Sequence, residues 1–342
     1  MVEITMLKAV IQKLVHNEDL SFDEAHDALD VIMHGEATEA QIGAFLVSLR
    51  MKGETPTEIG GLARAMRDNA VQIQTDQEDV VDTCGTGGDQ AGTFNISTTA
   101  AFIAAGAGVP IAKHGNRSVS SQCGSADVLR ELGVNIEASP QTVSECLNDI
   151  GIGFLYAPSL HPAMKYAIGP RRELGLRTVF NVLGPLTNPA GAKRQVLGVF
   201  SAQYTELLAT ALQALGSEHA VVVHGMVGID EIATCGDTQV TELRGGAVHS
   251  ALWSPEQFEL PAATMQDIAG GPPEDCARHL NAVLNGEEGP YRDIAVFNAA
   301  AAIYVGAKAS DVAEGIAMAN ESIDSGAAAA KLAALRELTR RR

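Results

Sequence analysis

The first part of the chain shows helical periodicity only. Apolar residues recur at helical spacing at Ile4, Leu7, Ile11 and Leu14. Three capping signals follow, each a Ser or Thr with an acid or amide three residues later, at Ser21–Glu24, Thr38–Gln41 and Thr55–Glu58. Pro56 also stands at a first helical position, where its missing N–H costs nothing. We predict that residues 1–72 form a small all-helical domain.

Beyond Val80 the pattern changes to short apolar runs that alternate with helical windows. Four of these runs are typical of buried strands: VPIA at 109–112, GFLYA at 153–157, QVLGVF at 195–200 and HAVVVH at 219–224. The helical stretch YTELLATALQALG separates the last two. The alternation predicts a large α/β domain over residues 73–342, with a mostly parallel central sheet covered by helices. Ligands of such domains bind beyond the carboxyl ends of the strands.

Length and composition agree with two domains. At 342 residues the chain exceeds the size at which one hydrophobic core keeps growing. Apolar residues make up 46% and aromatic residues only 4%, which favours helices packed on a sheet over an aromatic-rich β-sandwich. The most apolar stretches, 100–112 and 295–307, are shorter than a membrane span and are interrupted by Gly or Pro. We expect no membrane association and no cleaved leader.

The cysteines and the net charge narrow the function further. Five widely separated cysteines with no CxxC motif indicate neither a disulfide framework nor a zinc site, so we expect a cytoplasmic protein. The net charge of −18 disfavours binding to nucleic acid or anionic membranes. Residues 105–180 are an exception, with seven basic side chains against six acidic ones. An anionic ligand is expected to bind there.

A glycine turn follows the first strand-like run of the large domain. The stretch DVVDTCGTGGDQAGTFNIST, residues 79–98, places GTGGD between a strand and a helix that opens near Asn95 or Ser97. Backbone amides in such a turn can bind phosphate at a helix N-terminus. Gln90 stands where a dinucleotide-binding GxGxxG needs its third Gly, and the chain holds no Gly-Lys-Ser/Thr. A simple tight turn remains an alternative, but FNIST supplies more polar groups than one helix cap requires.

The next strand leads into a second polar loop. Lys113, His114, Asn116 and Arg117 are expected directly after the strand, at the carboxyl edge of the sheet. Four serines in the same loop add hydrogen-bond donors, namely Ser118, Ser120, Ser121 and Ser125. A solvated surface loop is the alternative interpretation. Two such loops on successive strands favour a polyanion site.

A pair of acids completes the pattern. Asp230 and Glu231 follow the strand HAVVVH in the stretch HGMVGIDE. Adjacent acids are common on protein surfaces. Opposite a phosphate site, however, their hard oxygen atoms suit Mg²⁺ shared between protein and phosphate.

These stretches together resemble one enzyme family. GTGGD, FNIST, KHGNRSVSSQCGSADVLRELG, HPAMK with the following Arg171, RTVFNVLGPLTNPA and VHGMVGIDE occur in this order along the whole chain. The chain is similar to the anthranilate phosphoribosyltransferases of tryptophan synthesis. The resemblance implies a nucleoside phosphorylase-like fold, in which a segment around residues 170–190 completes the small helical domain. It also implies a homodimer joined through the small domains.

The resemblance further implies the two substrates, phosphoribosyl pyrophosphate (PRPP) and anthranilate, and Mg²⁺ as cofactor. Anthranilate would lie near Gly85, Asn116 and Arg171, with the arginine facing its carboxylate. Mg²⁺ would be held by Ser97, Asp230 and Glu231. Gly169 and Pro170 precede Arg171, where a continuous helix is expected. The residues expected to bind PRPP are Gly85, Gly88, Asp89, Thr93, Asn95, Ile96, Ser97, Thr98, Lys113, His114, Gly115, Asn116, Arg117, Ser118, Ser121 and Ser125.

The expected reaction is attack of the anthranilate amine on C1 of the ribose while pyrophosphate leaves. Placement and charge stabilisation dominate such a reaction, so no general base is assigned. Two alternatives share the architecture. A pyrimidine nucleoside phosphorylase would use inorganic phosphate and a nucleoside. A catalytically silent relative would bind nucleic acid and would need a basic channel.

Overall fold

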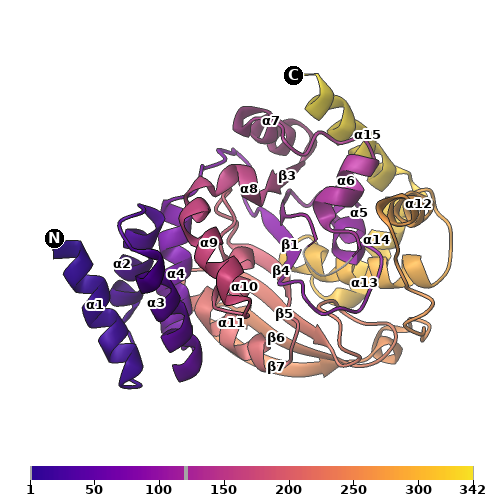
Figure 1. The fold of residues 1–342 in the computed structure, drawn as a ribbon. Helices are drawn as coiled ribbons and strands as arrows, with labels where there is room; N and C mark the ends of the chain where they lie inside the picture. Colours follow the sequence, from indigo (N-terminus) through magenta and orange to yellow (C-terminus); the bar gives the residue numbers. More distant parts are fainter. Residues whose placement is uncertain (1, 119–121, 342) are drawn as a thin grey trace.

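Four helices form the N-terminal part of the molecule. The structure is a computed structural model that describes residues 2–118 and 122–341. The helices are α1 (Val2–Val15), α2 (Phe22–Met33), α3 (Glu39–Lys52) and α4 (Pro56–Asp68), which lie together at one end of the molecule (Figure 1). All three predicted capping boxes are confirmed at the starts of α2, α3 and α4, and Pro56 is the first residue of α4.

Close backbone contact holds α4 against α2. A Cβ atom at Gly61 would lie 2.2 Å from the carbonyl oxygen of Phe22, so no larger residue fits at this crossing. The buried faces of these helices share one hydrophobic core with helix α11 (Gln203–Ala214) of the large part. The helical part is therefore packed firmly onto one face of the sheet.

A seven-stranded sheet forms the centre of the large part. Its order is β3-β2-β1-β4-β5-β6-β7, in which the first five members are parallel and the last two pairings are antiparallel. This confirms the predicted mostly parallel sheet. The strands are β1 (Val81–Gly85), β2 (Ile111–Gly115), β3 (Ile152–Tyr156), β4 (Arg194–Gly198), β5 (His219–Gly225), β6 (Thr238–Arg244) and β7 (Ala247–Trp253).

Helices cover both faces of the sheet (Figure 1). On β5, Val221 and Val223 point into the core beneath helices α5 and α13, whereas Ala220 and Val222 point into the core shared with α4 and α11. The remaining α-helices are α5 (Ile96–Gly106), α6 (Ser125–Glu131), α7 (Pro140–Ile150), α8 (Ala157–Leu160), α9 (Lys165–Leu174), α10 (Phe180–Leu183), α12 (Pro273–Leu284), α13 (Pro290–Val305), α14 (Val312–Asp324) and α15 (Ala327–Arg340). Short 3₁₀ helices span Pro162–Met164, Gly184–Leu186 and Pro255–Phe258.

One predicted boundary is wrong in a way that affects the site. Strand β2 begins at Ile111 rather than Val109 and continues to Gly115, because it pairs with β3 along its whole length. Lys113 and His114 therefore lie within the strand and are buried, not in the loop beyond it. Strands β6 and β7 have no counterpart among the predicted strands. Strand β7 exposes most of its residues and lacks a regular alternation.

The segment between β3 and β4 returns to the N-terminal helices. Helix α9 packs against α3 and α2, and α10 packs against α4. Gly169 and Pro170 do not interrupt α9, which is continuous through both residues. Arg171 therefore extends from a regular helix.

Candidate active site

The switch point of the sheet lies between β1 and β4. These strands are neighbours, although the chain passes through β2 and β3 between them. In the register of the pair, Gly85 at the end of β1 lies opposite Gly198 at the end of β4. Parallel sheets bind ligands at such a point, where the connections leave in opposite directions and open a crevice.

Asp230 fills the space above this glycine pair. A Cβ atom at Gly85 would lie 2.4 Å from Oδ2 of Asp230, and one at Gly198 would lie 1.6 Å from the Asp230 carbonyl oxygen. Both positions require glycine for this close approach. The ends of β1 and β4 thus place the carboxylate directly over the switch point.

The glycine turn is tied to the same carboxylate. The backbone N–H of Gly87 donates to Oδ2 of Asp230 at 2.8 Å, and the N–H of Asp230 donates to Asp89 at 3.4 Å. The carbonyl of Gly88 accepts a bond of 2.6 Å from the guanidinium of Arg177. GTGGD therefore forms a rim around Asp230.

The start of α5 faces the second carboxylate. The N–H of Ser97 donates to Oε1 of Glu231 at 3.1 Å. The Ile96 and Thr98 side chains are buried, so only their backbone groups are available to a ligand. Thr93 pairs with Ala269 and holds the loop that leads into the helix.

The pKa values of both acids are raised in the folded chain. Burial, together with the neighbouring Asp89 carboxylate, raises the pKa of Asp230 above its ordinary value. Burial and the charge of Asp230 raise the pKa of Glu231 in the same way. From the opposite segment Asp230 accepts the N–H of Gly87 and Glu231 accepts the N–H of Ser97, and Asp230 also hydrogen-bonds to the Asp89 side chain. The remaining oxygen lone pairs can bind a cation.

Lys113 lies beneath the start of α5. Its ammonium group donates to the Thr83 carbonyl and to Oγ of Ser97, the latter at 3.3 Å. The side chain is buried, and this burial lowers its pKa, against the opposing effect of Asp82. Lys113 therefore supports Ser97 from below.

His114 forms a buried pair with His161. The two Nε2 atoms are 3.3 Å apart, so one ring donates to the other. Burial lowers the pKa of His114 to about 3 and that of His161 to about 4. Both rings are neutral at physiological pH, and the His114 side chain points away from the glycine turn toward the segment that follows β3.

The loop after β2 is braced by α6. Asp127 accepts the N–H groups of Ser118 and Gly124 at 3.1 and 3.0 Å. The Ser125 hydroxyl donates to the carbonyl of Asn116 at 3.2 Å and packs against Gly115. Arg117 lies 3.8 Å from Glu137 at the surface. Ser120 and Ser121 lie outside the described residues.

Arg171 has a different setting on α9. Its guanidinium stacks over the Phe180 ring, with the carbon atom 4.8 Å from the ring centre. Burial lowers its pKa from the ordinary value. Within the residues the structure describes, no carboxylate lies within ion-pair distance of it. The half-buried charge is thus available to an incoming anion.

Comparison with known proteins places these features in a family. A model described as "Glycosyl transferase family, a/b domain" matches residues 77–329, and "Glycosyl transferase family, helical bundle domain" matches residues 8–70. The anthranilate phosphoribosyltransferase of Acetivibrio thermocellus is 54% identical over 334 residues, which cover 98% of this chain and 97% of the relative. The chain belongs to the anthranilate phosphoribosyltransferase family.

Solved structures of the anthranilate phosphoribosyltransferase family agree. The Thermus thermophilus protein superposes with a TM-score of 0.92 at 42% identity, covering 97% of this chain and 99% of its own. The Saccharomyces cerevisiae protein in complex with PRPP and Mg has a TM-score of 0.89 at 30% identity, with 98% of each chain covered. This membership favours the transferase over the phosphorylase and over the nucleic-acid-binding relative.

Sequence reasoning missed two buried polar residues that brace strand β2 at the candidate site. Asp82 is buried in β1, where it accepts the N–H of His114 at 3.0 Å, and burial raises its pKa to about 6. The Asn188 amide donates to the Ala112 carbonyl at 2.8 Å. An acid inside an apolar strand was the available signal for Asp82. Asn188 gave no signal, because its role depends on the return of the 184–190 segment to β2.

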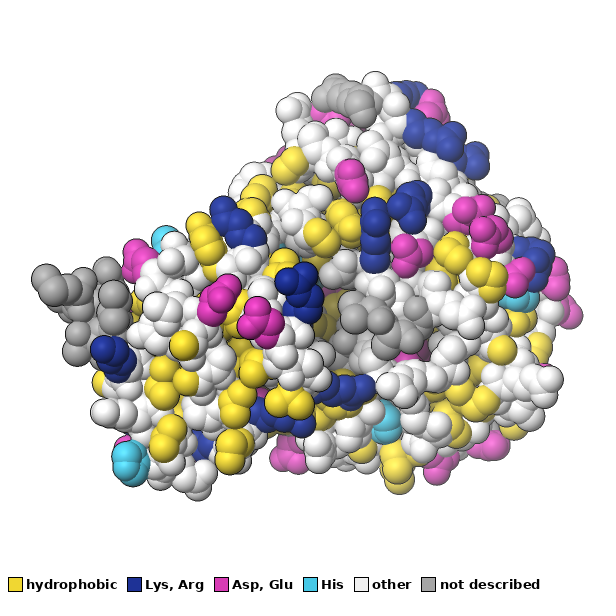
Figure 2. Space-filling model, in the orientation of Figure 1, with side chains coloured by type: hydrophobic (Ala, Val, Ile, Leu, Met, Phe, Trp, Pro, Cys, Tyr) yellow, Lys and Arg dark blue, Asp and Glu magenta, His cyan; other side chains and the backbone are white. Residues whose placement is uncertain are grey.

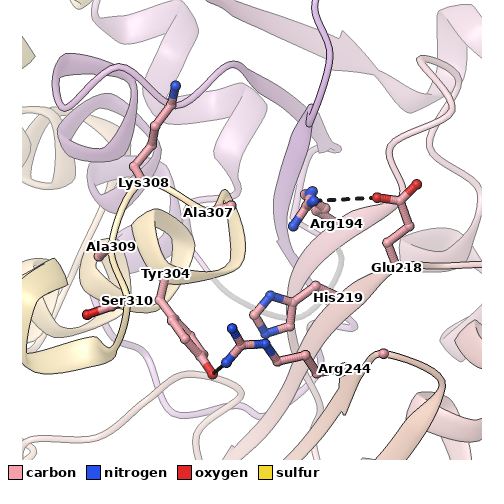
Figure 3. Close-up of a pocket in the computed structure, with 10 residues that line it drawn as sticks. Arg194, Glu218, His219, Arg244, Tyr304, Ala307, Lys308, Ala309 and Ser310 are labelled. Carbon is pink, nitrogen blue, oxygen red and sulfur yellow. Dashed lines mark hydrogen bonds and ion pairs between the residues drawn. The ribbon is translucent and has the colours of Figure 1, made fainter.

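A separate cavity of about 560 Å³ lies at the opposite end of the central strands, at the start of β4 and β5 (Figure 3). Arg194 and His219, the first residues of β4 and β5, line it. Arg194 is paired there with Glu218 at 3.4 Å, and Arg244 donates to the Tyr304 hydroxyl at 2.7 Å. Because this cavity opens at the amino ends of β4 and β5, it is not part of the site at their carboxyl ends.

Proposed function

We propose that the chain transfers the phosphoribosyl group of PRPP to the amine of anthranilate. The products are N-(5-phosphoribosyl)anthranilate and pyrophosphate, the second step of tryptophan synthesis from chorismate. One observation carries the proposal: the glycine turn and the start of α5 each bind a carboxylate, Asp230 or Glu231, across the switch point. Phosphate-binding amides and metal-binding oxygens are thereby placed side by side.

PRPP is expected to lie along the rim built by the two loops. The backbone groups of Gly85, Gly88 and residues 95–98 would bind the diphosphate, together with Asp89 and Thr93 through the metal or solvent. Gly115, Asn116, Arg117 and Ser118, with Ser125, would bind the remaining phosphate oxygens and the ribose. Lys113 and His114, which are buried in β2, would support these groups from within the sheet. Figure 2 shows basic side chains around the middle of this face, between the helical and the α/β parts. Such a setting attracts a polyanion to an otherwise acidic protein.

Ser97, Asp230 and Glu231 fit Mg²⁺. Their oxygen atoms are hard ligands, and a nearby cation would relieve the repulsion that helps to raise the pKa of both acids. Among the described residues, no group of three His, Cys, Asp or Glu side chains could hold a metal alone. Substrate phosphates would therefore complete the coordination. When bound, Mg²⁺ supplies positive charge that stabilises the departing pyrophosphate.

Anthranilate is expected near Gly85, Asn116 and Arg171. The Arg171 guanidinium is half-buried, stacked on Phe180 and available to a carboxylate. Asn116 is exposed at the end of β2, where its amide can orient the aromatic amine. The amine loses its proton only as or after it attacks C1, so the neutral His114 needs no role as base.

The packing of the helices also supports a division into domains. We propose that residues 1–72, completed by about 170–190, form the small domain and that residues 73–342 form the large domain. The packing of α9 and α10 on the N-terminal helices supports this division. A cytoplasmic location is proposed because all five cysteines, which lie in the described part of the chain, form no disulfide. Among the described residues, no helix is long and apolar enough to cross a bilayer.

A homodimer through the small domains is also proposed. Large apolar side chains are exposed on three neighbouring helices: Val15 on α1, Met51 on α3, and Tyr166 and Ile168 on α9. Figure 2 shows apolar side chains on the surface of this helical part. An exposed apolar patch of this kind is typical of an interface. Light scattering of the native chain and of Met51→Glu tests the proposal, with a shift of the variant toward monomer expected.

Release of pyrophosphate tests the function against its rivals. The purified chain is expected to release pyrophosphate from PRPP only when anthranilate and Mg²⁺ are both present. A phosphorylase would instead consume a pyrimidine nucleoside with inorganic phosphate. A silent nucleic-acid-binding relative would do neither and would shift a DNA or RNA probe in a salt-dependent manner.

A further inference from the structure

The glycine turn of residues 85–89 has little rigidity of its own. Gly87 and Gly88 have positive φ values of 63° and 78°, and Gln90 follows with 59°. Glycine permits this conformation, but it also leaves the backbone without a side chain that could restrict it. The position of the turn therefore depends on groups of other segments that bind its backbone.

Arg177 supplies one of these contacts from the segment between α9 and α10. A nitrogen of its guanidinium donates to the Gly88 carbonyl at 2.6 Å. The guanidinium also lies over the ring of Phe200, the second residue beyond β4, with its carbon atom 4.4 Å from the ring centre. Stacking and hydrogen bonding together fix both the plane of the guanidinium and its direction.

Phe200 also holds the turn through its backbone. Its N–H donates to the Thr86 hydroxyl at 3.1 Å, and the Thr86 N–H donates to the carbonyl of Gly198 at 2.8 Å. The beginning of the turn is therefore bound to the end of β4. Arg177, stacked on the same Phe200, binds the residues that follow.

The helical part of the molecule determines where Arg177 lies. The carbonyl of Arg177 accepts a hydrogen bond from the guanidinium of Arg50 on α3, and the three residues that follow it, 178–180, are buried. Arg50, Arg177 and Gly88 therefore form a continuous path from α3 to the glycine turn.

The hydrogen bond to the Gly88 carbonyl also orients the next amide. The peptide bond between Gly88 and Asp89 is trans, so its C=O and N–H groups point in opposite directions. Because the carbonyl is directed at Arg177, the N–H of Asp89 is directed away from it. Arg177 thus fixes the direction of an amide in a turn that is expected to bind phosphate.

The contact with Arg177 is independent of the proposed metal site. The N–H of Gly87 is held by Oδ2 of Asp230, whose carboxylate is proposed to bind Mg²⁺. A bound cation would share this oxygen with the turn. The bond from Arg177 to Gly88 involves no carboxylate and can persist when the metal is bound.

We propose that Arg177 is a positioning residue for PRPP, which holds the glycine turn in the conformation that the diphosphate binds. Loss of its side chain should leave the metal ligands and the anthranilate site in place but allow the turn to take other conformations. Binding of PRPP would then have to order the turn, which lowers the affinity. This proposal rests on the proposed function, because PRPP is the ligand that the turn is expected to bind.

Hydrogen exchange of the substrate-free chain tests the structural part. The peptide that contains residues 84–91 is followed by mass spectrometry. Its exchange should be about threefold faster or more in Arg177→Ala, and also faster in Phe200→Leu, which keeps the charge of Arg177 but removes the ring beneath it. Arg172→Ala, which removes an exposed arginine of α9, is the matched control and should exchange like the wild type. Wild-type exchange over the rest of the chain verifies that each variant is folded. Unchanged exchange of the turn in Arg177→Ala overturns the proposal.

Steady-state kinetics tests the consequence for the reaction. In Arg177→Ala the KM for PRPP should rise roughly three- to thirtyfold, the range for one lost hydrogen bond from a charged group, while the KM for anthranilate stays close to that of the wild type. Phe200→Leu should also raise the KM for PRPP. The double variant should be little worse than Arg177→Ala, because both changes release the same contact. Arg177→Lys should recover part of the affinity, since an ammonium group can donate to the carbonyl but lacks the planar face that stacks.

Two kinetic results would contradict this role of Arg177. A raised KM for anthranilate alone would place the guanidinium at the aromatic substrate. A raised KM for PRPP with normal exchange of the turn and no effect of Phe200→Leu would mean that the guanidinium binds phosphate directly. Failure of the proposed function is seen separately, because the wild-type chain would then show no turnover of PRPP with anthranilate, whereas the exchange experiment needs no substrate.

Discussion

Replacement of Arg171 tests the position of the aromatic substrate. The guanidinium is half-buried on α9, stacked on Phe180, and without a carboxylate within ion-pair distance among the described side chains. If it pairs with the carboxylate of anthranilate, Arg171→Ala removes one charge-assisted contact. Such a contact contributes about 1.5 to 3 kcal/mol, so kcat/KM for anthranilate should fall roughly ten- to a hundredfold. The KM for PRPP should barely change.

Steady-state kinetics with each substrate varied in turn measures this effect. Arg172→Ala is the matched control, because Arg172 is the next residue of the same helix and is exposed, and exposed charges usually contribute little. Arg171→Lys should recover part of the affinity, since it keeps the charge but not the planar fork. Equal effects on both substrates, or no effect at all, would refute the assignment. The anthranilate pocket would then lie elsewhere, with Arg177, which contacts Gly88, as the next candidate.

Three further predictions concern the metal site and the core beneath it. The double variant Asp230→Asn, Glu231→Gln should no longer respond to added Mg²⁺, because the carboxylates that hold the metal are gone. Its affinity for anthranilate, measured by fluorescence titration, should stay nearly intact. A Mg²⁺ dependence of turnover like that of the wild type would contradict the role of the two acids. Gly85→Ala should lower kcat about tenfold or more, because its Cβ would displace the Asp230 carboxylate, and full activity would exclude this close approach. His161 is neutral in the fold with a pKa of about 4 against 6.5 when unfolded, so the unfolded chain binds more protons below pH 6.5 and stability falls as pH falls. From pH 7.5 to 5.5 this one group should cost about 1.4 kcal/mol, so the pH-dependent loss measured by urea unfolding should be smaller by about that amount in His161→Asn than in the wild type, and the loss that remains in the variant comes mainly from His114.

The sequence predicts the elements well because their signals are local. The three capping boxes and the glycine turn depend on neighbouring residues and are found where expected, and each of the four apolar runs overlaps a strand. The end of β2 is different. Lys113 and His114 look like loop residues, yet Asp82, Ser97 and His161 satisfy their polar groups inside the sheet. Partners from distant segments decided this boundary, and no local pattern contains them.

The same contrast between local signals and distant partners holds for the candidate site. The pairing of Asp230 with the glycine turn and of Glu231 with Ser97 agrees with the predicted approach of the acid pair to the segment of residues 85–98. Asp82 carried a signal as an acid inside an apolar strand, but its role could not be assigned, because His114 and Asn188, which bind it, come from distant segments. Asn188 carried no signal, because it binds the backbone of β2. Chemistry-bearing residues carry their own signal in the sequence. Residues that act by bracing the backbone become visible only in the fold.

Loss of anthranilate fluorescence is the measurement that tests the central claim most directly. The purified chain is mixed with anthranilate, PRPP and Mg²⁺, and fluorescence is followed over time while circular dichroism verifies that the chain is folded. The account predicts a steady decrease that requires all three components and is abolished by chelation of the metal. A folded chain that leaves anthranilate fluorescence unchanged with both substrates and Mg²⁺ present would contradict it.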